Sequence, residues 1–240
     1  IDGTETDIDW TNSTSALVST WSGFSDTLSG IQTYEYAIGT TSGGTEIVDW
    51  TDNSTDTSVT KTNLTLSNGS TYYVSSRALD NVGNVSEPAV SDGITLDTDA
   101  PVISSVSEGT FAEDIDFQNS DSTLIITWSG DDGGSGISTY EYALGTTSGG
   151  TETIDWTSTG TSTADTLTGL SLTEGSTYYL STRATDAAGN VSAILTGDGI
   201  TIDLTAPAGT TVSDGTSDDI AYTGSDSTLS ANWTAFTEAT

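Results

Sequence analysis

Carboxylates are the main reactive groups of this chain, and few other groups are present to assist them. Its 240 residues include 35 Asp and Glu against three Lys and Arg, with no His, Cys or Met, which gives a net charge of −32. Thiolate, imidazole and disulfide chemistry is therefore excluded. Such an excess of negative charge repels phosphate backbones and anionic membranes, so nucleic acid is excluded as a partner. The chemistry left to clustered carboxylates is cation binding or acid–base catalysis.

Five Asp residues form the candidate metal site. They lie in the phrases LDTD, SGDDGGSG and TDAAGN, and they are Asp97, Asp99, Asp131, Asp132 and Asp186. Ca²⁺ takes six to eight oxygen ligands in flexible geometry, so carboxylates without His or Cys suit it. The alternative interpretation is turn chemistry, in which Asp accepts hydrogen bonds from backbone N–H groups and Gly supplies a positive φ. No segment matches a twelve-residue EF-hand loop, so the site depends on topology bringing these loops together.

The sequence repeats itself at a spacing of 106 residues. TYEYAIGTTSGGTE at Thr33 to Glu46 returns as TYEYALGTTSGGTE at Thr139 to Glu152, and a third copy begins near Asp214. A register held over this length indicates one structural unit used in series. Each unit is long enough to bury a core of its own.

Comparison of the copies separates core aromatics from candidates for ligand binding. Trp21, Trp128 and Trp233 occupy equivalent positions and are expected to be core residues, which leaves Trp50 and Trp156 as the aromatics that could stack on a sugar. Close carboxylate pairs could hydrolyse glycosides, but no pair is marked by a residue that only one copy carries. We therefore predict no catalytic residue and no enzyme activity.

The apolar residues alternate with polar ones in short runs rich in Val, Ile, Tyr, Thr and Trp, which indicates an all-β fold. Gly, Asn, Asp and Ser clusters separate the runs. Seven strands are predicted in the complete second copy, the last of them broken near Gly197. They cover residues 102–107, 122–129, 137–146, 151–157, 163–170, 177–185 and 191–203. Seven strands with turns between them are typical of a β-sandwich.

Several positions in each copy resemble a known module. Trp128 lies in the second strand, Leu172 precedes Tyr178 by six residues, and Tyr178, Leu180 and Ala184 share one face of a later strand. This pattern resembles the fibronectin type III module. The first copy repeats the pattern with Trp21, Leu66, Tyr72, Val74 and Ala78. The phrases YEYALGTT, ATDAAGNVS and IDLTAP are similar to the fibronectin III or Ig-like tandem repeats of large bacterial surface proteins and adhesins.

The resemblance implies tandem seven-stranded fibronectin III-like (Ig-like) β-sandwiches arranged end to end. In that topology the B–C and F–G loops lie where strand A enters the module, so Asp131, Asp132 and Asp186 should face Asp97 and Asp99. The implied cofactor is Ca²⁺ at the module junction. Ala-Pro sequences at Pro101 and Pro207 predict short, stiff, extended connections, because Pro fixes its own φ and restricts the residue before it. Thr182 and Ser76 depart from the aliphatic residues usual in the family and indicate a thinner core.

The copies divide the chain into three parts. Residues 1–98 are predicted to be a first module that lacks its first strand, residues 99–205 a complete second module, and residues 206–240 the start of a third with strands A and B only. One reading of these partial ends is that the chain is part of a longer array. The other is that one chain completes the next, head to tail, by strand addition.

Seven of the nine Asn residues lie in N-x-S/T sequons, which suits a secreted protein at a bacterial surface. We therefore expect a non-catalytic extracellular segment that extends an adhesin, stalk or filament, with neighbouring repeats or copies of itself as partners and surface glycans or proteins as further candidates. The alternatives are a carbohydrate-binding or spacer module of a secreted polysaccharide-degrading enzyme, and a filament subunit joined by strand complementation.

Overall fold

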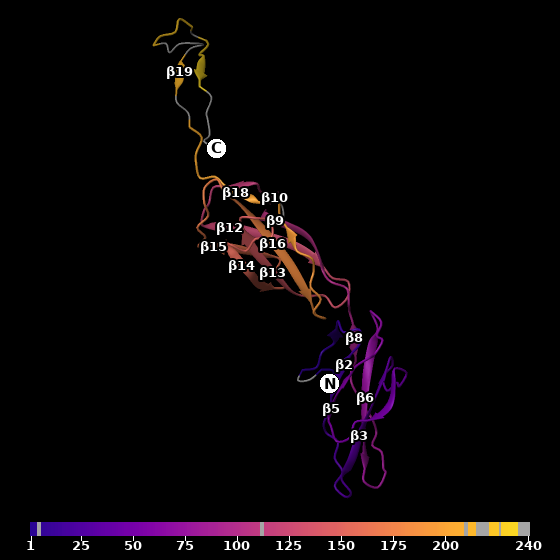
Figure 1. Ribbon diagram of the computed structural model, residues 1–240. Coiled ribbons are helices and arrows are strands. Elements are labelled where there is room, and N and C mark those ends of the chain that lie inside the picture. Colours follow the sequence, from indigo (N-terminus) through magenta and orange to yellow (C-terminus); the bar gives the residue numbers. More distant parts are fainter. Residues whose placement is uncertain (4–5, 111–112, 209–210, 215–220, 226, 235–240) are drawn as a thin grey trace.

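The computed structural model describes residues 1–3, 6–110, 113–208, 211–214, 221–225 and 227–234, and its elements follow one another along an elongated path (Figure 1). Every regular element in these ranges is a β-strand, which confirms the all-β prediction. No helix in the described part of the chain is long and apolar enough to cross a membrane.

The first sheet of the second module contains four strands in the order β10-β9-β12-β15. These are β9 (Val102–Thr110), β10 (Glu113–Asp114), β12 (Thr123–Asp131) and β15 (Ala164–Thr168). Side chains alternate between buried and exposed along β15, as expected for strands with one face on a core. The predicted strands at residues 102–107, 122–129 and 163–170 are thereby confirmed.

The second sheet packs against the first in the order β11-β18-β16-β13-β14, with β17 paired to β16. Its strands are β11 (Phe117–Gln118), β13 (Ile137–Gly145), β14 (Ile154–Gly160), β16 (Thr177–Asp186), β17 (Leu195–Thr196) and β18 (Ile200–Ile202). The predicted break near Gly197 is confirmed, because it falls between β17 and β18. The short strands β10 and β11 were not predicted.

The chain changes sheets between β9 and β11. Gly109, which lies in β9 opposite Asp114 of β10, has φ +139°, and a Cβ there would lie 2.4 Å from the carbonyl oxygen of Glu113, so only Gly fits. After the crossover, β11 runs parallel to β18, with Phe117 opposite Thr201. The two sheets are thus connected along one edge by a segment that belongs to both.

The core of the second module confirms the residues that suggested a fibronectin-like sandwich. Trp128 is fully buried, and its ring lies 5.8 Å from that of Tyr142. The Tyr178 hydroxyl accepts a hydrogen bond of 3.0 Å from the Thr173 backbone N–H, just after buried Leu172. Thr182 is fully buried, and its Oγ1 has no hydrogen-bond partner, so a polar group occupies a core position.

The first module repeats this arrangement with eight strands. They are β1 (Trp10–Thr11), β2 (Leu17–Thr20), β3 (Ile31–Gly39), β4 (Val48–Asp52), β5 (Ser58–Lys61), β6 (Thr71–Asp80), β7 (Ala89–Val90) and β8 (Ile94–Leu96). β1 again runs parallel to β8. Ile1 to Gly3 lie beside β2, in the position that β9 takes beside β12 in the second module. Asp2 forms an antiparallel β-bridge with Ser19.

The start of the third copy forms a two-stranded sheet. β19 (Val212–Asp214) pairs with β20 (Ala231–Trp233) in antiparallel register. Trp233 is 63% exposed, so the core position predicted for it is not realised here. The reason is that, among the described residues, this two-stranded sheet has no second sheet to cover the indole.

Candidate functional site at the module junction

The segment between the first two modules is bound by groups from both of them. From the second module, the Ser135 backbone N–H donates to Asp97 Oδ2 at 2.7 Å, and Asn190 Nδ2 donates to the carbonyl oxygens of Asp97 and Asp99 at 2.9 and 3.2 Å. From the first module, Asn68 Nδ2 donates to Asp99 Oδ2 at 2.8 Å. The linker is therefore fixed on two sides rather than suspended between the modules.

The structure brings three of the five predicted Asp residues together. One carboxylate oxygen from each of Asp97, Asp132 and Asp186 lies within 4.8 Å of the others. Asp99 and Asp131 lie outside this group. Asp99 is bound to Asn68, and Asp131 is exposed at the end of β12.

Protein donors already occupy most of the oxygens in this group. Asp132 Oδ2 accepts from the N–H groups of Gly134 and Gly136 at 3.1 and 2.7 Å. Asp186 accepts from the backbone and the side chain of Asn190 at 2.7 and 2.8 Å. Only Asp132 Oδ1 is buried without a donor. The arrangement follows the turn-chemistry alternative closely, and the Ca²⁺ site at these residues stays a prediction.

Asp97 is the buried centre of the junction. Burial acts to raise the pKa of this carboxyl, but hydrogen bonds from Ser135 and from the Asp99 N–H outweigh it, so the pKa lies below its ordinary value. Asp97 therefore acts as a charged acceptor for the B–C loop. The loop approaches closely, since a Cβ on Gly134 would lie 2.4 Å from Asp97 Oδ2.

The two Trp residues considered for sugar stacking are covered by arginine. The Arg77 guanidinium lies 4.1 Å from the centroid of the Trp50 ring, and that of Arg183 lies 4.3 Å from the Trp156 ring. Each Arg also pairs with a carboxylate on the neighbouring strand: Arg77 with Glu35 at 2.6 Å and Arg183 with Glu141 at 2.8 Å. The sequence did not predict the cation–π contacts, which hold each guanidinium over a Trp ring.

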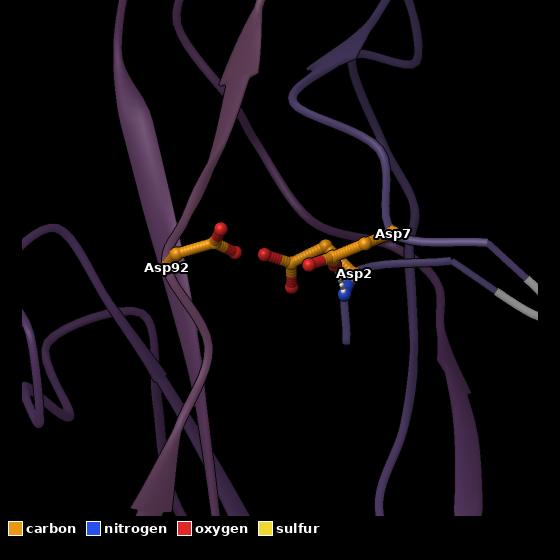
Figure 2. A group of neighbouring side chains, drawn as sticks. All are labelled: Asp2, Asp7 and Asp92. Carbon is orange, nitrogen blue, oxygen red and sulfur yellow. Dashed lines mark hydrogen bonds between the residues drawn. The ribbon is translucent and has the colours of Figure 1, made fainter.

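Two further carboxylate clusters were not predicted from the sequence. Asp2, Asp7 and Asp92 gather in the first module (Figure 2), and Glu108, Asp114 and Asp198 gather in the second. The repeat could have indicated them, because the 106-residue offset relates the acidic residues Asp2 to Glu108 and Asp92 to Asp198. A one-residue insertion displaces the third pair, Asp7 and Asp114, from this register.

Comparison with known proteins gives one curated relative and several solved structures of similar fold. No protein-family model matches the chain. Exoglucanase B of Cellulomonas fimi is 33% identical over 168 residues, a match that covers 64% of this chain and 14% of that enzyme. The chain therefore corresponds to a small part of that enzyme's length.

The fibronectin(III)-like modules of Clostridium thermocellum CbhA align with a TM-score of 0.50 and 12% identity, covering 85% of this chain and 93% of that one. The FN1–FN3 domains of chicken CNTN1 align with a TM-score of 0.46 and 17% identity, covering 85% of this chain and 66% of that one. In each module a Tyr hydroxyl, of Tyr72 or Tyr178, accepts a hydrogen bond from the backbone N–H five residues before it. Together with the two sandwiches and these contacts, the alignment to CbhA shows that this chain has the fold of tandem fibronectin type III-like modules.

Proposed function

We propose that this chain is a non-catalytic spacer segment of an extracellular bacterial protein that carries other domains. The observation that carries the proposal is the junction, where the Asp97–Asp99 linker is hydrogen-bonded to both neighbouring modules. A tied linker restricts the angle between modules, which is useful for holding other parts of a protein apart. The similarity to a short part of a bacterial exoglucanase supports the same role. Service in an adhesin, stalk or filament is the finer form of this proposal.

Asn190 is the residue on which the stiffness depends most. Its side-chain amide donates to the carbonyl oxygens of Asp97 and Asp99 and to Asp186 Oδ2, so one group links the F–G turn to the linker. Pro101 is buried at the entry to β9 and fixes φ there. Asn84, the equivalent residue of the first module, makes the same bonds within its own turn to Asp80.

The test measures the distribution of distances between modules. The chain has no Cys, so spin labels can be attached at Ser42→Cys and Ser148→Cys, two exposed hairpin positions related by the repeat. We expect a narrow distribution that broadens in Asn190→Ala and stays narrow in Asn84→Ala. A distribution in the parent chain as broad as that of Asn190→Ala would overturn the proposal.

The observed packing disfavours the carbohydrate-binding alternative. Arg77 and Arg183 each cover one face of a Trp ring, so a pyranose would have to compete with a guanidinium there, and both Trp50 and Trp156 are only partly exposed. Strand complementation between chains stays a prediction, with β19 paired to β20 of the same chain. Ca²⁺ binding at Asp97, Asp132 and Asp186 also stays a prediction, and Asp132 Oδ1 is the oxygen open to it.

A further inference from the structure

A carboxylate cluster lies where the second module's two sheets are joined. Glu108 lies near the end of β9, Asp114 in β10, and Asp198 in the break between β17 and β18. One oxygen from each lies within 4.8 Å of the others. Asp114 Oδ1 also accepts a 3.0 Å hydrogen bond from the Glu108 backbone N–H. The cluster therefore connects the crossover segment to the last strand of the module.

Glu108 is the member that the protein alone leaves unsatisfied. Its side chain is fully buried, its Oε1 accepts a 2.9 Å hydrogen bond from the Leu180 N–H, and its Oε2 has no donor. Arg183 is the only basic residue of β16, the strand that carries Leu180, and it is already paired with Glu141. A buried carboxylate oxygen without a donor or a counter-charge costs several kcal/mol, so this position calls for a cation or a proton.

The first module carries the same arrangement with different residues. Asp2 is fully buried, its Oδ1 has no donor, and its backbone N–H donates to Asp7 Oδ1 at 2.7 Å. Figure 2 shows the carboxylates of Asp2 and Asp7 pointing across a gap toward that of Asp92, and oxygens of all three lie within 4.8 Å. A buried, incompletely bonded carboxylate facing two others thus occurs twice.

Two residue differences between the modules occur together and keep a buried carboxylate in the same place. In the first module, Ser91 Oγ accepts a 3.0 Å hydrogen bond from the Val74 N–H, and Asp2, with its shorter side chain, supplies the carboxylate. In the second, Gly197 replaces Ser91, and the longer Glu108 reaches the equivalent N–H of Leu180. A Cβ on Gly197 would lie 2.5 Å from Glu108 Oε2, so Glu108 fits only because Gly is present.

We propose that each cluster, Asp2–Asp7–Asp92 and Glu108–Asp114–Asp198, binds one Ca²⁺ ion. Ca²⁺ lies 2.3–2.6 Å from its oxygens, so ligands on opposite sides of the ion are about 4.6–5.2 Å apart, and one oxygen from each member of these clusters lies within 4.8 Å of the others. The ion supplies the missing partner of Glu108 Oε2 and Asp2 Oδ1 and offsets the repulsion among three carboxylates. It also ties the crossover segment to the break before the final strand. This proposal is independent of the spacer function.

The test counts bound Ca²⁺ on the full chain after treatment with a chelator, by equilibrium dialysis and by titration calorimetry. Glu108→Gln keeps an oxygen that accepts from the Leu180 N–H but removes the charge. Asp2→Asn likewise removes the charge and keeps an oxygen that accepts from the Gly93 N–H. We expect each single variant to lose one ion and the double variant to lose both. Ca²⁺ should raise the melting temperature of the parent chain, and each variant should lose that rise in its own module.

Two control variants show whether the ions bind at these clusters. Asp121→Asn changes an exposed carboxylate outside both clusters and should leave both ions in place. The swap Glu108→Asp with Gly197→Ser rebuilds the first module's version and should keep the ion that Glu108→Gln loses. The proposal is overturned if the parent chain binds no Ca²⁺ at millimolar concentration, which would mean that a proton satisfies Glu108, or if the double variant binds as many ions as the parent.

Discussion

Without metal, the buried carboxyl of Glu108 should make the second module less stable as the pH rises. Burial, aided by the charges of Asp114 and Asp198 and opposed by the Leu180 N–H, raises its pKa from 4.5 to about 7. Because the folded pKa is higher than the unfolded one, the unfolded chain loses this proton first. As far as Glu108 is concerned, the free energy of unfolding is highest below pH 4.5 and falls as the pH rises toward 7.

The size of this effect follows from the shift. Each pKa unit corresponds to about 1.4 kcal/mol, so ionising Glu108 in the metal-free fold costs on the order of 3 kcal/mol above pH 7. Glu108→Gln cannot ionise and keeps the amide hydrogen bond. In chelator it should therefore be about 3 kcal/mol more stable than the parent at pH 8 and about equal to it at pH 5.

The assay is differential scanning calorimetry in chelator at pH 5, 6, 7 and 8, with the second module identified as the transition that the variant shifts. Asp121→Asn, an exposed carboxylate of the same module, is the control and should follow the parent at every pH. The reasoning is refuted if Glu108→Gln shows the parent's pH dependence, or if it is less stable than the parent at pH 8. In millimolar Ca²⁺ the order at pH 8 should reverse, because only the parent gains a bound ion in the second module.

Two further substitutions test the core and the junction. Trp128→Ala empties a fully buried site, so it should lower the free energy of unfolding of the second module, measured in urea, by about 3–5 kcal/mol. Trp233→Ala, at an exposed site, should change this free energy little. A loss below about 1 kcal/mol for Trp128→Ala would contradict the core assignment. Gly134→Ala places a Cβ against Asp97 Oδ2 and should speed amide hydrogen exchange in the B–C loop, while Gly133→Ala, with open space around it, should not; equal exchange in the two variants would show that the loop does not depend on this close approach.

Local pattern was enough to predict most of the sandwich. The alternation of apolar residues located the main strands, and the spacing of Leu172 and Tyr178 indicated a fibronectin-like module, in whose core both side chains are buried. These features are encoded within a few residues of one another, so a single sequence reveals them. The exposure of Trp233 was not predicted, because burial depends on a second sheet and not on the strand that carries the residue.

The contacts that were missed join residues far apart in the chain. Arg183 stacks on Trp156 only because β16 and β14 both pair with β13, and Glu108 meets Leu180 only because β9 packs against β16 of the other sheet. The order and offset of strands decide such contacts, and the composition of each strand does not. At the junction, topology predicted that five Asp residues would meet, and only Asp97, Asp132 and Asp186 do so. Topology could not show that Asn190 and the loop amides would occupy the oxygens of these three.

The parallel pairing of β1 with β8 and of β11 with β18 has a mechanical consequence. Each pair joins a strand near the beginning of a module to the strand at its end, side by side and in the same direction. When a rod of such modules is pulled from its two ends, these strands are drawn past one another lengthwise. Their hydrogen bonds are then loaded together in shear instead of opening one at a time, so the seam that closes each sandwich is also the part that bears tension.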